Sequence, residues 1–175
     1  NNNLLEKIPQ YSLSSKDGNG KEFKNTYLLG TIDLRFNKLT ELSDDFRATT
    51  LPYLTNMDVS FNRFSEIPTQ PLNSSVLQAF GIRHQRNAAG ERCLRDWPTG
   101  ITKCPSLLQL QIGSNDIRKV NEEMTPKLWI LDIKDNPNIS IDLTSICPYI
   151  EAGMYMLIYD KTQDIRGCDA LDIKR

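Results

Sequence analysis

The sequence has few of the residues on which most enzymes and metal sites depend. It contains a single histidine, His84, which excludes any metal site with two histidine ligands. Its four cysteines are too far apart to form a Cys-x-x-Cys pair, and no Gly-x-Ser-x-Gly, phosphate-loop or dinucleotide motif is present. We therefore expect no catalytic residue, no metal and no cofactor.

Neither an excess of charge of one sign nor a long apolar run is present. Lys and Arg number 21 and Asp and Glu number 22, which gives a net charge of −1, and both signs are scattered along the chain. A protein that binds nucleic acid through phosphate contacts would show a basic excess, so we expect no nucleic-acid partner. No apolar stretch approaches 18 residues, so we also expect no membrane span.

Leucine, isoleucine and asparagine are abundant, with 21, 16 and 14 copies, and their order is repetitive. The template LxxLxLxxNxL occurs in four copies that begin at Leu29, Leu54, Leu107 and Leu128. Two degraded copies begin at Leu77 and Met154, with Gln85 and Thr162 at the asparagine position. The spacing that recurs in these copies predicts a ladder of buried asparagines, each at the end of one strand: Asn37, Asn62, Asn115 and Asn136.

The segments between these copies also align, because Leu51-Pro52, Cys104-Pro105 and Cys147-Pro148 occupy one position. On these motifs the chain resembles leucine-rich-repeat proteins over nearly its whole length, in particular uncharacterised surface proteins of gut bacteria. The resemblance implies an α/β fold, a right-handed solenoid with a parallel β-sheet on its concave face and short helical or 3₁₀ turns on its convex face. It also implies a bacterial, extracellular or cell-surface location and no enzymatic activity.

The repeats predict one domain, residues 1–175, of about five to six units. Strand starts are expected near residues 8, 29, 54, 77, 107, 128 and 154, hairpin insertions near 16–22 and 86–92, and a C-terminal cap near 164–175. Ile8 fits either a strand start or the return segment that contains Ile67 in a later repeat, and the sequence leaves both registers open. The chain begins inside a repeat, so we expect it to be the C-terminal part of a longer array.

Two cysteines, Cys104 and Cys147, stand where Leu51 stands in an earlier repeat, which predicts that both are small buried core residues. Cys93 follows the second hairpin and Cys168 lies in the cap. Of the three sets of pairings open to four cysteines, Cys93 with Cys104 joins the nearest in sequence, but the sequence favours free thiols over any disulfide.

Alternation along each strand predicts which side chains point outward on the concave face. They form a polar strip of mixed charge that we take as the candidate binding surface: Asp33, Arg35, Phe36, Asp58, Ser60, Phe61, Arg83, His84, Gln109, Gln111, Asp132 and Lys134. The resemblance implies that this surface binds a protein partner. The alternatives are a structural spacer in a larger surface protein and a carbohydrate-binding surface that uses Phe36, Phe61 and Trp129.

Overall fold

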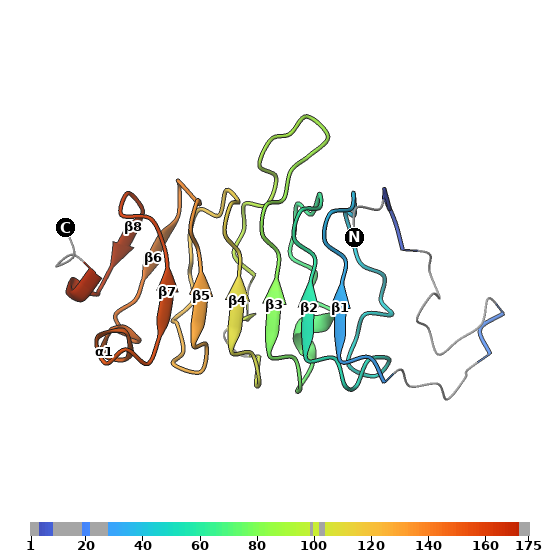
Figure 1. Ribbon diagram of the computed structural model, residues 1–175, viewed down its shortest axis with the longest axis horizontal. Coiled ribbons are helices and arrows are strands. Elements are labelled where there is room, and N and C mark those ends of the chain that lie inside the picture. The colour runs from blue at the N-terminus through green and yellow to red at the C-terminus, as the bar shows by residue number, and fades with distance from the viewer. Residues whose placement is uncertain (1–3, 9–18, 22–27, 99, 102–103, 172–175) are drawn as a thin grey trace.

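The computed structural model describes residues 4–8, 19–21, 28–98, 100–101 and 104–171. Six three-residue strands lie side by side in one parallel sheet (Figure 1). Their order is that of the chain: β1 (Thr31–Asp33), β2 (Asn56–Asp58), β3 (Ala79–Gly81), β4 (Gln109–Gln111), β5 (Ile130–Asp132) and β7 (Met156–Ile158). Each turn of the chain adds one strand, so the fold is the leucine-rich-repeat solenoid that the sequence predicts.

The register of this sheet follows the repeat template. The middle residue of each strand pairs with the middle residue of the next, and each occupies the fourth template position. Because alternate side chains of a strand point to opposite sides, these six residues enter the core while their neighbours face out. The inward row is Ile32, Met57, Phe80, Leu110, Leu131 and Leu157, all buried except the half-buried Leu157 at the end of the sheet.

The return segments contain short helical turns, as their proline content predicts. One 3₁₀ turn, η1 (Pro71–Asn73), begins on a proline, and the five-residue helix α1 (Cys147–Glu151) has Pro148 in its first turn. After the concave strand of its repeat, the chain forms a further short strand in two places. These strands, β6 (Ser140–Asp142) and β8 (Asp164–Arg166), pair in parallel as a second, two-stranded sheet. The core lies between these layers.

Hydrogen bonds at the start of the chain decide the register of Ile8. Leu5 N–H donates to Asn37 Oδ1 at 3.4 Å, as Leu39 N–H donates to Asn62 Oδ1 at 2.9 Å one repeat later. Leu5 therefore occupies the position of Leu39, and Ile8 belongs to a return segment rather than to a strand. Most of the first predicted hairpin, near 16–22, and the other residues of that first copy lie outside the described residues.

The last repeat departs from the predicted spacing in two places. Tyr155 enters the core at 5% exposure, whereas Met154, the predicted core residue, is 61% exposed. Gln163 takes the strand-closing role expected of Thr162, because its buried side chain donates to the carbonyl oxygens of Ile133 and Asn136. A longer amide side chain one residue later reaches the same backbone groups.

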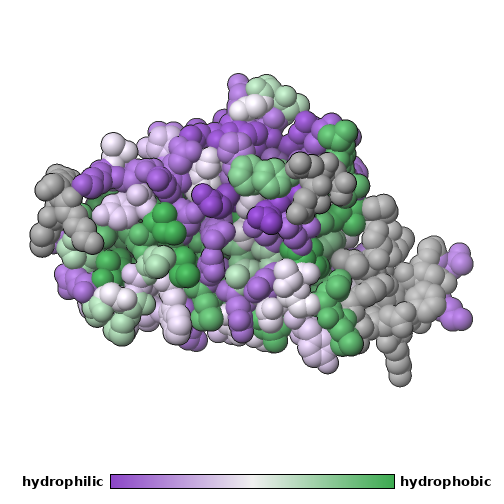
Figure 2. All heavy atoms as spheres, viewed as in Figure 1, coloured by the Kyte–Doolittle hydropathy of each residue, from purple (hydrophilic) through white to green (hydrophobic). Residues whose placement is uncertain are grey.

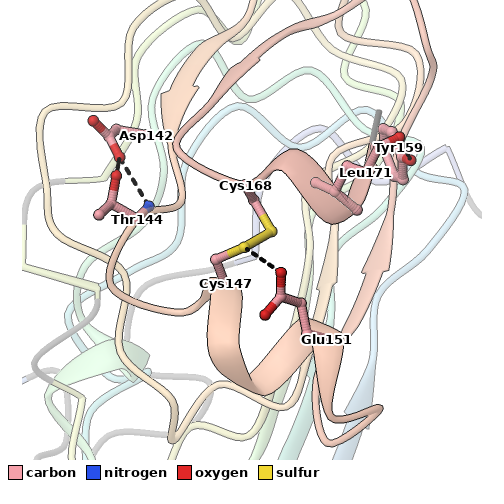
Figure 3. The surroundings of a disulfide bond; sticks show 7 residues. All are labelled: Asp142, Thr144, Cys147, Glu151, Tyr159, Cys168 and Leu171. Carbon is pink, nitrogen blue, oxygen red and sulfur yellow. Dashed lines mark hydrogen bonds between the residues drawn. A yellow bond between two sulfur atoms is a disulfide. The ribbon is translucent and has the colours of Figure 1, made fainter. Parts of the chain in front are cut away.

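The C-terminal end is closed by a disulfide between Cys147 and Cys168 (Figure 3). It joins the start of α1 to the residue before η3 (Asp169–Leu171). Both cysteines are buried, but the expectation of a free Cys147 thiol in the core is wrong. Cys93 and Cys104 are free and half-buried, so the nearest pair in sequence is not joined. Sequence spacing could not reveal this contact because the cap folds back on α1.

Candidate binding surface

The outward side chains of β1 and β2 come together on the concave face. Arg35 Nη2 lies 2.8 Å from Asp33 Oδ2, and Arg35 Nε lies 3.8 Å from Asp58 Oδ2. The hydrogen bond from Arg35 lowers the pKa of Asp33 to about 2, so this carboxylate is charged at neutral pH. These side chains border a shallow hollow of about 270 Å³ that extends over β1 to β4 and is also lined by Asn56, Ala79, Gly81, Gln109 and Gln111.

The aspartates of this strip also terminate strands. Each accepts the backbone N–H two residues later through its Oδ1 atom: Asp33 from Arg35 at 3.0 Å, Asp58 from Ser60 at 2.9 Å, and Asp132 from Lys134 at 3.1 Å. Such side-chain caps satisfy backbone donors at the point where the ladder ends. The column that alternation predicts as a binding strip is therefore partly structural.

Two residues of the predicted surface are buried, contrary to expectation. Ser60 is 1% exposed, and its hydroxyl accepts the backbone N–H of Arg83 at 2.9 Å. Asp132 is 3% exposed, and its carboxylate lies beside Gly113 and pairs with Arg83 at 3.3 Å. In both cases a short outward side chain is covered by contacts with another strand's residues, which alternation within one strand cannot reveal.

The eighth template position forms a column along the rim of the concave face. Its residues have positive φ, between 53° and 59°, a conformation unfavourable for bulky side chains: Phe36, Phe61, His84, Ser114 and Asp135. Phe36 and Phe61 stack with ring centroids 4.4 Å apart, and Phe61 contacts His84 at 4.9 Å. The two faces of Phe61 are thus occupied by its neighbours, although 37% of the residue is exposed.

The rim column borders a second hollow, of about 290 Å³, lined by Phe61, Arg83, His84, Ser114, Lys134 and Asp135. His84 Nδ1 lies 3.1 Å from Ser114 Oγ. Burial, together with the charges of Arg86 and Arg92, lowers the pKa of His84, so its ring is neutral at neutral pH. The structure therefore brings together four residues of the predicted surface, Phe61, Arg83, His84 and Lys134. The two other lining residues, Ser114 and Asp135, were not part of that prediction.

The segment 86–92 projects from the rim beyond β3 (Figure 1). Gly90 N–H donates to the carbonyl oxygen of Asn87 at 3.0 Å, and Gly90 has a φ of 81°. Arg86 and Arg92 pair across the base of this hairpin. Their guanidinium groups reach back over the rim, where Arg86 donates to Ser114 O at 2.7 Å and Arg92 to Asp135 Oδ1 at 2.6 Å. Neither arginine is among the residues predicted for the surface, because both lie in the predicted hairpin insertion rather than on a strand.

Hydrophobic side chains gather on the concave face over β5 and β7, whereas hydrophilic ones predominate along the middle of this face (Figure 2). Trp129 and Met156 are 60% and 57% exposed, and Met156 N–H donates to the carbonyl oxygen of Trp129. The alternation in β7 indicates that Met156 faces out, but the surface prediction stopped at the preceding repeat.

The asparagine ladder is present, and Gln85 completes it. Asn62, Asn115 and Asn136 are buried, and each donates its amide to backbone carbonyl oxygens of its own and the preceding repeat. Asn37 is half-buried and donates to Leu34 O at 2.9 Å. These amides are structural and take no part in the candidate surface.

Among the described residues, no group of three His, Cys, Asp or Glu side chains could hold a metal ion. The same part of the chain includes no helix of the length and apolarity needed to cross a membrane.

No protein-family model and no curated protein matches the chain. Solved structures do match, and the two described next are leucine-rich repeat proteins. The one from Bacteroides thetaiotaomicron is 77% identical with a TM-score of 0.92, and the match covers 99% of this chain and 20% of that one. The one from Bacteroides eggerthii is 74% identical with a TM-score of 0.90, over 97% of this chain and 27% of that one. The chain thus spans about a fifth to a quarter of these proteins.

Proposed function

We propose that this chain, a leucine-rich-repeat protein like its Bacteroides neighbours, is a non-enzymatic module that binds a protein partner through its concave face and the adjoining rim. The observation that carries the proposal is the convergence of outward side chains from successive repeats on one face. The parallel register of the strands aligns these side chains in columns across the repeats. Repeat proteins use such extended surfaces for recognition.

The shape of the surface fits a protein better than a small molecule. Its two hollows, of about 270 and 290 Å³, lie at or below the lower end of the usual range for small-molecule pockets. Each has room for a few side chains of a partner, and the exposed Trp129 and Met156 provide apolar contacts of the kind enriched in protein interfaces.

Carbohydrate binding through Phe61 is less well supported, because an aromatic platform needs an open ring face. Phe61 is stacked between Phe36 and His84, so its faces are taken. The disulfide between Cys147 and Cys168 supports an extracellular or cell-surface location, since disulfides persist in oxidising compartments.

A photo-crosslinking experiment in the native bacterium tests the proposal. Benzoylphenylalanine would replace Asn56 or Gln109, two concave-face residues whose side chains make no hydrogen bond within the described part of the chain. The matched control position is Glu66, which is exposed on the return half of its repeat. We expect Asn56 and Gln109 to capture the same protein and Glu66 to capture none.

Equal capture from all three positions would reject the concave face as the binding surface. If no position captures a protein, the spacer role is favoured. Glycan-array binding that is lost in Phe61→Ala would instead establish carbohydrate as the ligand.

A further inference from the structure

Two positively charged side chains that line the rim hollow flank a position that carries no side chain. Arg83 and Lys134 follow β3 and β5 at the same template position, and Gly113 holds that position after β4. A Cβ atom on Gly113 would lie 2.9 Å from Asp132 Oδ1 and 3.0 Å from the carbonyl oxygen of Lys134. A side chain at Gly113 would therefore displace the Asp132 carboxylate or the backbone of Lys134, so the position between the two cations has room only for glycine.

The charges around the hollow leave a positive excess. Four cations surround it, Arg83, Arg86, Arg92 and Lys134, against three carboxylates, Asp132, Asp135 and Asp160, so 4 − 3 gives +1. Asp132 is paired with Arg83 at 3.3 Å and Asp135 with Arg92 at 2.6 Å. Asp160 accepts the backbone N–H of Asp135. Lys134 is exposed and has no ion pair with a described carboxylate.

Other groups in the hollow fit an organic anion better than a bare ion. Phe61 and His84 provide an aromatic wall, and Ser114, whose hydroxyl accepts a hydrogen bond from Arg86 at 3.1 Å, also lines the hollow. An acidic side chain could place its carboxylate near Lys134 and its methylene groups against the aromatic wall.

We propose that this rim hollow binds the carboxylate of an acidic peptide segment, with Lys134 and Arg83 as its charged contacts. The inference rests on the proposed protein-binding function and specifies one anchor of the partner. A peptide is favoured over an acidic sugar because the hollow accommodates a side chain and offers only the edge of Phe61. Its location beside the concave face allows one partner to occupy both.

Two blocked peptides that differ only in charge test the proposal: acetyl-Gly-Glu-Gly-amide and acetyl-Gly-Gln-Gly-amide. Binding to ¹⁵N-labelled protein would be followed by amide chemical shifts. We expect the glutamate peptide to shift the amides of Gly113, Ser114 and Lys134, and to bind roughly tenfold or more tightly than the glutamine peptide, because a charged hydrogen bond is gained. Added salt should weaken this binding.

Variants identify the contact. Lys134→Gln should weaken binding of the glutamate peptide roughly tenfold, whereas Lys127→Gln, at an exposed lysine before β5, should leave it unchanged. Both lysines are at the surface, so neither variant should affect folding.

Equal binding of the two peptides, no shift with either, or no effect of Lys134→Gln would overturn the proposal. Glucuronic acid that shifts the same amides when the glutamate peptide does not would also overturn it, in favour of an acidic sugar. Crosslinks from Asn56 to a protein partner without peptide binding would leave the proposed function standing and reject only this anchor.

Discussion

The side-chain oxygen of Gln85 accepts the backbone N–H of Phe64 at 3.0 Å, so a glutamine performs the role that asparagine has in the neighbouring repeats. Its Nε2 atom donates to the carbonyl oxygens of Val59 and Arg83, and Gln85 is fully buried. The repeat that looks degraded in sequence is thus closed by the same kind of contact as the others.

Gln85→Ala should lower the free energy of unfolding by about 1–3 kcal/mol, because buried backbone groups would lose their partner. Asn62→Ala should have a similar effect for the same reason. Gln78→Ala, at an exposed glutamine of the same repeat, is the control and should change little. Urea denaturation measures all three, and a Gln85→Ala protein as stable as the control would contradict the ladder assignment.

Gly81 and Asp58 should be energetically coupled. A Cβ atom on Gly81 would lie 2.8 Å from Asp58 Oδ1, the atom that accepts the N–H of Ser60. Gly81→Ala should therefore displace the carboxylate and destabilise the fold by about 1 kcal/mol, the typical net contribution of one hydrogen bond. In an Asp58→Ala background the same change should have a smaller effect. Strict additivity in this double-mutant cycle would show that the two residues do not interact.

Removal of the Cys147–Cys168 disulfide should destabilise the protein by about 2–4 kcal/mol, because the unfolded chain gains freedom. The double variant Cys147→Ser/Cys168→Ser should melt at a lower temperature than the oxidised protein. Alkylation of unreduced protein should modify two thiols, on Cys93 and Cys104. Modification of four thiols in protein isolated from the native cell would argue against both the bond and an oxidising location.

The stability of the protein should fall as the pH decreases through about 6.5, the ordinary pKa of histidine. Burial first, and then the positive charges of Arg86 and Arg92, lower the pKa of His84 in the folded state. In that pH range the unfolded chain therefore binds a proton that the folded protein does not, and stability is lost as the pH falls.

His84→Gln isolates this contribution, because His84 is the only histidine in the sequence. The free energy of unfolding, measured between pH 8 and pH 5, should depend less steeply on pH in the variant. A loss of stability that is the same at every pH does not change the slope of the free energy of unfolding against pH. Identical slopes for the two proteins would therefore refute the lowered pKa of His84.

Prediction from sequence was most successful where one side chain repeats at a fixed spacing. The row from Ile32 to Leu131 is buried as alternation predicts, and Asn62 and Asn115 lie in the ladder. Prediction failed where a residue's environment comes from another repeat or from a loop. Ser60 is covered by contacts with the following repeat, and Arg92 reaches the rim from a hairpin that has no place in the template.

The sequence by itself determined the solenoid, because the LxxLxLxxNxL spacing fixes which side chains must be buried and where each strand must end. It also determined the polar character of most of the concave face. Only the tertiary structure decided which outward residues are accessible, which cysteines meet, and that Arg83 and Lys134 line the same hollow. These features depend on contacts between side chains far apart in sequence, and such contacts exist only once the repeats are stacked.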